Sequence, residues 1–284
     1  SKQNGDFKSP FAVEIKNINK SFGPVQANKE ISLNVSGGTI HGIIGENGAG
    51  KSTLMSILYG FYQPDSGEIK VHGKLAYFKQ PSDALRLGIG MVHQHFMLVP
   101  NFTALENIVL GAEGKTGLYK GLQKARKKLE KLKQAYGLEV ELDSLTENLP
   151  VGIQQRIEIL KALYRGARVL ILDEPTGVLT PLETEQLFEI LLALKSEGVT
   201  ILLITHKLHE IMAITDEVSV MRQGKMVANT LTKHTSPEML AEQMVGRSVL
   251  VNNKYELQSI GKVVLSAEQL GVVDKRGFDS LKNA

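Results

Sequence analysis

One stretch of the sequence matches the phosphate-loop pattern G-x-x-x-x-G-K-[ST]. It comprises Gly45, Glu46, Asn47, Gly48, Ala49, Gly50, Lys51, Ser52 and Thr53. Glycines allow such a loop to fold into a concave nest of backbone N–H groups that can contact phosphate oxygens, and a helix beginning at Lys51 adds its positive end. The Lys51 ammonium is expected to reach the β- and γ-phosphates, and the Ser52 hydroxyl to ligate Mg²⁺. The pattern therefore predicts a site for ATP with Mg²⁺.

Two further groups of polar residues follow apolar runs. Asp173 and Glu174 come directly after Val169–Leu172, and His206 comes shortly after Ile201–Ile204. Asp173 is expected to hold Mg²⁺ through water, and Glu174 is our candidate for the base that orients the attacking water. His206 is our candidate sensor of the γ-phosphate. The alternatives are a capping or salt-bridging carboxylate at position 174 and a structural histidine at position 206.

The elements that must position these residues alternate between strand and helix. Ile40–Ile44 predicts a buried strand, 51–59 a helix, and 182–195 a helix with apolar residues at helical spacing. Such alternation is typical of an α/β fold with a mostly parallel sheet covered on both faces, here the P-loop NTPase fold. The three apolar strands should end at the same edge of the sheet, where ligands bind in such folds. Residues 13–18 and 31–35 alternate as half-buried strands and predict an N-terminal antiparallel part.

Residues from about 95 to 165 are helical in pattern and predict a helical subdomain inserted into the sheet domain. The basic stretch 124–133 within it is interpreted as a solvated helix face, because leucines at 122, 129 and 132 give it one apolar side. A nucleic-acid-binding patch is the alternative.

The composition is that of an ordinary soluble globular protein. Of the 284 residues 42% are hydrophobic and 22% charged, which provides for one large domain or one domain and a fragment. The net charge of +3 is too small to indicate nucleic-acid binding. With no cysteine, the sequence excludes disulfides and thiolate chemistry. Because no apolar run approaches the roughly 18 residues of a membrane span, a membrane role is expected to depend on a partner.

The order of these motifs resembles the ATP-binding cassette (ABC) family over about residues 11–248. The resemblance rests on the phosphate loop, Gln94, the segment 149–156, the segment 172–176 and His206. It implies that Phe22 stacks on adenine and that Gln94 contacts Mg²⁺ and senses a partner. It also implies that segment 149–156 is the signature motif, which binds the γ-phosphate held by an opposite cassette.

The signature motif departs from the family's usual Leu-Ser-Gly-Gly-Gln. Pro150, Val151 and Ile153 replace the serine, the first glycine and the glutamine, whereas Gly152 is retained. Proline has neither a hydroxyl nor an N–H to offer a phosphate. In the loop after Glu174, Thr180 stands where the family commonly has an aspartate. We therefore expect this signature motif to be weakened.

The segments 91–99 and 174–180 resemble the tandem-cassette ATPases of bacterial sugar and nucleoside importers, with 95–98 closer to the nucleoside branch. This resemblance implies an ATP hydrolase at the cytoplasmic face of the membrane, peripheral, driving uptake of a nucleoside or simple sugar. Its implied partners are transmembrane permease subunits, a second cassette in the same polypeptide and, indirectly, a substrate-binding protein, with no nucleic acid. The permease is expected to dock near 96–100; core packing of Phe96 and Leu98 is the alternative.

The alternative function is a soluble ABC ATPase acting on the ribosome or on DNA. The interval between Lys51 and Leu149 lacks the sustained heptads of repair ATPases, and 252–262 is too short for the charged helical linker of tandem translation factors. A nucleotide kinase would leave Gly152 and His206 unexplained.

The last part of the sequence suggests an internal repeat. Residues 263–270 repeat the pattern of 12–18, and 280–283 take the place of 27–30. We therefore expect a nucleotide-binding domain over 1–250, followed over 251–284 by a linker and the start of a truncated second cassette. An ordinary C-terminal strand is the alternative.

Overall fold

The computed structural model describes residues 9–93, 96–112 and 118–246, together with 266, 271–273 and 279–281. Contacts divide the chain into two units, Ser1–Val249 and Leu250–Ala284. In the second unit, β11 (Val272–Val273) pairs antiparallel with β12 (Asp279–Leu281). Most of 263–283 lies outside the described residues, so the internal repeat stays a prediction.

The larger unit is built on a six-stranded sheet with the order β10-β9-β3-β8-β7-β6. Neighbouring strands from β9 through β6 are parallel, and β10 is antiparallel at the edge. The predicted mostly parallel sheet is therefore confirmed, and β3, β8 and β7 end at one edge. The strands are β3 (Ile40–Ile44), β6 (Ile89–Val92), β7 (Val169–Asp173), β8 (Thr200–Ile204), β9 (Glu217–Arg222) and β10 (Lys225–Leu231).

A second sheet, with the order β2-β1-β4-β5, is entirely antiparallel. It confirms the predicted N-terminal antiparallel part, although β1 and β2 are each longer than the alternating stretches indicated. Its strands are β1 (Phe11–Phe22), β2 (Val25–Ser36), β4 (Ser66–Val71) and β5 (Lys74–Ala76).

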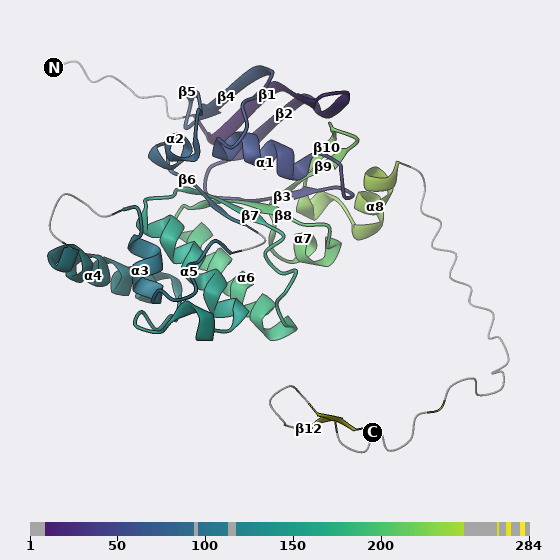
Figure 1. The fold of residues 1–284 in the computed structure, drawn as a ribbon. Helices are drawn as coiled ribbons and strands as arrows, with labels where there is room; N and C mark the ends of the chain where they lie inside the picture. The colour runs from purple at the N-terminus through teal and green to yellow at the C-terminus, as the bar shows by residue number, and fades with distance from the viewer. Residues whose placement is uncertain are drawn as a thin grey trace, which may run out of the picture. The chain divides into compact units, whose positions relative to one another are not determined.

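Helix α1 lies between the two sheets, whereas the helices of the inserted part lie on the other side of the central sheet (Figure 1). Successive strand residues point to opposite faces. Accordingly Ile171 of β7 packs in the cluster with α1 and the antiparallel sheet, while Leu170 and Leu172 pack in the cluster with α5 and α6. The helices are α1 (Lys51–Tyr59), α2 (Pro81–Arg86), α3 (Ala104–Val109), α4 (Leu118–Tyr136), α5 (Val151–Tyr164), α6 (Pro181–Ser196), α7 (Leu208–Ile214) and α8 (Pro237–Val245), with 3₁₀ turns at Thr146–Asn148 and Thr232–His234.

The predicted helical subdomain is made of α3, α4 and α5. In α4, Leu129 is fully buried, while the lysines at 124, 127, 128 and 131 are exposed. Arg126 pairs with Asp143, and the Lys128 ammonium lies 4.6 Å from the centre of the Tyr164 ring. The basic stretch thus forms the polar side of an amphipathic helix, as the solvated-face interpretation expects.

A buried histidine in β3 is expected to make the fold sensitive to acid. The His41 ring is fully buried; its Nε2 lies 2.8 Å from the Ser219 hydroxyl, and its Nδ1 has no hydrogen-bond partner. Burial lowers the pKa of His41 to about 4. The folded state therefore stays unprotonated below the ordinary pKa, whereas the unfolded state takes up a proton, so stability present at neutral pH is lost as the pH falls.

The free energy of unfolding should accordingly be lower at pH 5 than at pH 7.5 by about 2 kcal/mol through His41. Urea unfolding followed by circular dichroism at the two pH values measures it. His41→Gln should remove this part of the pH dependence, and His234→Gln, at an exposed position, should leave it unchanged. An unaltered pH dependence in His41→Gln would contradict the assignment.

Candidate functional site

The phosphate-loop residues connect the end of β3 to the start of α1. Gly48 and Gly50 adopt the left-handed backbone conformation, with φ of 81° and 98°. A Cβ at Gly50 would also lie 2.3 Å from the carbonyl oxygen of Ala27, so that position has no room for a side chain. Helix α1 begins at Lys51, directly after Gly50. The turn demanded by the sequence pattern therefore ends at a helix N-terminus, the arrangement that suits a bound phosphate.

Three residues outside the motif hold the loop in place. Buried Asn28 of β2 donates from its side chain to the Gly50 carbonyl (3.1 Å), and the Gly224 N–H donates to the Ala49 carbonyl (3.1 Å). The Lys29 N–H in turn donates to the Gly224 carbonyl at 2.7 Å. No sequence motif marks these three supports. The local pattern indicates only the turn at Gln223 and Gly224, with φ of 50° and 77°, because hairpin turns of this kind favour glycine.

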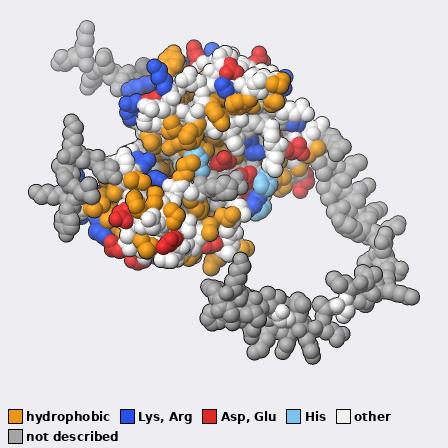
Figure 2. Space-filling view, in the orientation of Figure 1, with side chains coloured by type: hydrophobic (Ala, Val, Ile, Leu, Met, Phe, Trp, Pro, Cys, Tyr) orange, Lys and Arg blue, Asp and Glu red, His pale blue; other side chains and the backbone are white. Residues whose placement is uncertain are grey.

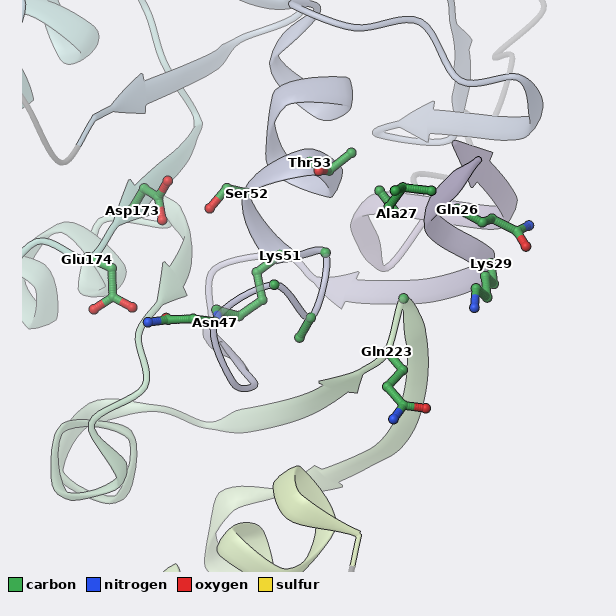
Figure 3. Close-up of a pocket in the computed structure, with 15 residues that line it drawn as sticks. Gln26, Ala27, Lys29, Asn47, Lys51, Ser52, Thr53, Asp173, Glu174 and Gln223 are labelled. Carbon is green, nitrogen blue, oxygen red and sulfur yellow. The ribbon is translucent and has the colours of Figure 1, made fainter. Parts of the chain in front are cut away.

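The phosphate loop borders a pocket of about 520 Å³. In the close-up, Asp173 and Glu174 lie on one side of Lys51, and Gln26, Ala27, Lys29 and Gln223 lie on the other (Figure 3). Acidic, basic and histidine side chains also gather across the middle of the face seen in Figure 2. The pocket is lined by Val25, Gln26, Ala27, Lys29, Asn47, Gly48, Ala49, Gly50, Lys51, Ser52, Thr53, Asp173, Glu174, Gln223 and Gly224.

The charges in the pocket suit a magnesium nucleotide. The Lys51 ammonium donates to the carbonyls of Gly45 (2.7 Å) and Glu46 (3.1 Å). Burial lowers the pKa of Lys51, while the charges of Glu174 and Asp173 act to raise it. Burial raises the pKa of Asp173, and the neighbouring charge of Glu174 adds to this effect against a hydrogen bond from Ser52. Mg²⁺ prefers oxygen ligands. The Asp173 carboxylate and the Ser52 hydroxyl lie close enough to hydrogen-bond, so together they fit the ion.

Glu174 and His206 lie together, as expected from the ends of neighbouring strands. Glu174 Oε1 is 2.9 Å from His206 Nδ1, and its Oε2 is buried without a hydrogen-bond partner among the described atoms. The backbone of Glu174 has a φ of 48°, a left-handed conformation that is uncommon for a non-glycine residue, and its N–H donates to the Ile204 carbonyl at 2.9 Å. A buried carboxylate oxygen without a partner is costly, so a water molecule bound to Oε2 would be stabilised there.

Three of the predicted site residues that the structure describes, Phe22, Gly45 and His206, are not among those that line the pocket. Phe22, 43% exposed at the end of β1, packs edge-on against Tyr62 with ring centres 5.2 Å apart and does not line the pocket. The first residues of β2, Val25, Gln26 and Ala27, line the pocket instead. Gln94 lies outside the described residues. The adenine contact of Phe22 and the Mg²⁺ contact of Gln94 stay predictions.

The signature segment 149–156 begins α5, away from the phosphate-loop pocket. Pro150 precedes the helix, and a Cβ at Gly152 would lie 2.6 Å from the Glu183 carboxylate. That carboxylate accepts from the N–H and hydroxyl of Thr180, and these bonds, followed by one from the Gly152 N–H, hold the pKa of Glu183 below its usual range. Buried Gln155 donates to the Pro175 carbonyl at 2.7 Å, which ties the signature helix to the loop that carries Glu174.

Comparison with known proteins agrees with this geometry. Residues 28–177 match the family described as ABC transporter. The chain is 48% identical over 270 residues to the nucleoside import ATP-binding protein NupA of Lactococcus lactis subsp. cremoris, covering 95% of this chain and 53% of that protein. It is 45% identical to the guanosine import ATP-binding protein NupO of Bacillus subtilis, covering 96% of this chain and 54% of that protein. The chain thus spans about half the length of these curated relatives.

Solved structures of similar fold are cassettes as well. A nucleotide-free ATP-binding cassette from an ABC transporter superposes with a TM-score of 0.70 at 27% identity, covering 81% of this chain and 97% of that one. The ADP conformation of another cassette gives 0.71 at 27% identity, covering 84% and 96%. With the phosphate loop, the paired acids and His206 in the arrangement described, the chain belongs to the ABC transporter family.

Proposed function

We propose that this chain is the ATP-hydrolysing cassette of an importer that takes up nucleosides, and that it works at the cytoplasmic face of the membrane on permease partners. The observation that carries the catalytic part is the pocket in which Lys51, Asp173 and Glu174 converge. The relatives named for nucleoside import, at 48% and 45% identity, support a nucleoside over a simple sugar, since relatives named for glucose and ribose import are 40–43% identical. Among the described residues, no helix is both long and apolar enough to cross a bilayer.

Five residues at the site take a part in hydrolysis in this proposal: Lys51, Ser52, Asp173, Glu174 and His206. Lys51 and the loop N–H groups would bind the phosphates, and Ser52 and Asp173 would hold Mg²⁺, which supplies charge neutralisation on the phosphates when bound. Glu174 orients the attacking water through its unpaired oxygen and accepts its proton. His206 steadies that carboxylate at 2.9 Å and meets the γ-phosphate from the end of the neighbouring strand.

The permease docks, in this proposal, at a groove between the sheet domain and the helical subdomain. The groove has a volume of about 250 Å³ and is lined by Tyr59, Phe61, His93, Met97, Glu158, Lys161 and Arg165, among others. Met97 is 65% exposed, whereas Phe96 and Leu98 pack against the core. Of the predicted docking segment 96–100, Met97 is therefore the side chain best placed to contact a partner.

A second cassette is proposed to cover the face around the signature segment. Three apolar side chains there remain exposed, Val151 at 39%, Val178 at 61% and Leu182 at 65%. Val178 lies in the loop that follows Glu174, so a partner on this face would contact the segment next to the proposed base.

The docking proposal can be tested by single-cysteine crosslinking, because the chain has no cysteine of its own. In the assembled transporter, Met97→Cys should crosslink to the permease. Tyr77→Cys, a 78% exposed position directly after β5, is the matched control and should not. Equal capture from both positions, or capture from Tyr77→Cys alone, would overturn the docking site.

The transport proposal is tested by uptake. Cells from which the gene for this chain is deleted should lose uptake of labelled guanosine, and the unaltered gene should restore it. Uptake of labelled ribose in the same cells is the control for substrate class. Loss of ribose uptake with guanosine uptake intact would move the assignment to sugars, and hydrolysis stimulated by ribosomes or DNA would favour the soluble alternative.

A further inference from the structure

A buried carboxylate, Glu210 of α7, connects the two loops that carry Glu174 and His206. Its exposed fraction is 1%, and it lies outside every motif of the sequence analysis. Its Oε1 accepts from the Thr176 hydroxyl, and its Oε2 accepts from the Thr205 hydroxyl at 3.3 Å. Thr176 follows β7 two residues after Glu174, and Thr205 follows β8 directly before His206. One side chain therefore joins both strand ends.

A lysine completes the cluster. Lys207 Nζ lies 3.2 Å from Glu210 Oε1 and donates to the carbonyl and the hydroxyl of Thr176, each at 3.1 Å. The Lys207 N–H also donates to the Thr205 hydroxyl at 3.0 Å. The buried charge of Glu210 is thus paired and hydrogen-bonded on both oxygens, which is the condition under which a buried charge is tolerated.

The cluster bears on the reaction because it adds side-chain bonds between the two loops, beyond the bond from the Glu174 N–H to the Ile204 carbonyl that joins the strand ends. Glu174 has the uncommon φ of 48°, and the His206 ring is 56% exposed, so packing does little to hold that ring in place. The 2.9 Å contact between Glu174 and His206 depends on the separation of their two loops. Thr176 and Thr205, both buried, are the points at which Glu210 sets that separation.

We infer that Glu210 is a positioning residue for ATP hydrolysis, which holds the Thr176 and Thr205 loops so that Glu174 and His206 meet at the pocket. This inference rests on the roles proposed above for Glu174 and His206. Glu210 itself does not line the phosphate-loop pocket, so it acts through those two residues. Small displacements of reacting groups reduce rates strongly, about 100-fold for a shift of about 1 Å.

In the assembled transporter, Glu210→Gln should lower ATP turnover about 10- to 100-fold. The amide has one acceptor where the carboxylate has two, and it carries no charge for Lys207. The dissociation constant for ATP, measured by calorimetry, should change less than about twofold, since the binding loop is untouched. Glu189→Gln, at an exposed position of α6, is the matched control and should turn over normally.

A double-mutant cycle separates positioning from general stability. When His206→Ala is already present, adding Glu210→Gln should lower turnover by less than about twofold, because the geometry that Glu210 maintains is already lost. Thr176→Val, which removes only the hydroxyl, should lower turnover as much as Glu210→Gln does. Thr176→Ser, which keeps the hydroxyl, should turn over normally. Independent, multiplicative effects in the cycle, or normal turnover in Thr176→Val, would overturn the inference.

Glu174→Gln, assayed alongside, separates this inference from the proposed function. If Glu174→Gln loses turnover and Glu210→Gln does not, the positioning role fails and the proposed function stands. If Glu174→Gln turns over normally, the proposed function of Glu174 fails, and the positioning role fails with it.

Discussion

A Glu174→Gln variant should bind ATP with the affinity of the unaltered protein and hydrolyse it at least about 100-fold more slowly. The glutamine keeps the shape of the side chain and its ability to contact His206 at 2.9 Å. It lacks the basic oxygen that the structure leaves buried and unpartnered beside the pocket. The change therefore affects the orientation and deprotonation of water, and leaves the phosphate-binding loop intact.

Calorimetric ATP binding and turnover of the assembled transporter, measured on the same preparation, test this prediction. Glu185→Gln is the control, because Glu185 is an exposed carboxylate on α6 that does not line the phosphate-loop pocket. Turnover by Glu174→Gln at the rate of this control would show that another group orients the water. A large loss of ATP affinity would instead give Glu174 a role in binding.

The sequence predicted the parts of the site that depend on local pattern. The apolar runs 40–44, 169–172 and 201–204 became β3, β7 and β8, each in register with its parallel neighbour. Because parallel strands end at one edge, the polar residues that follow them had to come together. The phosphate loop was equally predictable, since its glycines and Lys51 occupy fixed positions between a strand and a helix.

The supports of the site were not predictable, because they join residues distant in the sequence. Asn28 holds Gly50, Gly224 holds Ala49, and Glu210 holds Thr176, yet none of these pairs has a spacing that any helix or strand period would mark. A buried Asn or Glu looks like an exposed one until the fold is known. Such contacts are a property of the packed structure rather than of any local segment.

Loss of the Lys51 ammonium should impair uptake by the assembled transporter far more than a change in the signature segment does. Lys51→Ala should weaken ATP binding about 10- to 100-fold, because charge-assisted hydrogen bonds to the phosphates are removed. Lys29→Ala is the matched control. It also removes a lysine from the pocket lining, but on the side opposite Asp173 and Glu174, and it should weaken binding less than tenfold (Figure 3). Equal affinity of Lys51→Ala and the unaltered protein would refute the assignment.

In the assembled transporter, Lys51→Ala should abolish uptake, whereas Gly152→Ala should leave much of it. In this family each ATP site is expected to pair the phosphate loop of one cassette with the signature of the other. Pro150 offers neither hydroxyl nor N–H, and Gly152 faces Glu183 of its own chain, which would repel a phosphate. A lost donor to a transition-state oxygen costs about 10²–10³ in rate, so a site completed by this signature should already be slow.

We expect the two ATP sites of the assembled transporter to be unequal, because this chain has an intact phosphate-loop pocket but a weakened signature. Lys51, Asp173 and Glu174 line one pocket, which in the two-cassette proposal is completed by the signature of another cassette. Two copies of this chain would then offer each other only the weakened signature. The chain alone should therefore hydrolyse ATP much more slowly than the assembled transporter. Uptake and turnover should be measured for Lys51→Ala and Gly152→Ala, with thermal unfolding to confirm that both variants are folded. Gly152→Ala as damaging as Lys51→Ala, or full-rate hydrolysis by the isolated chain, would mean that both sites are equivalent.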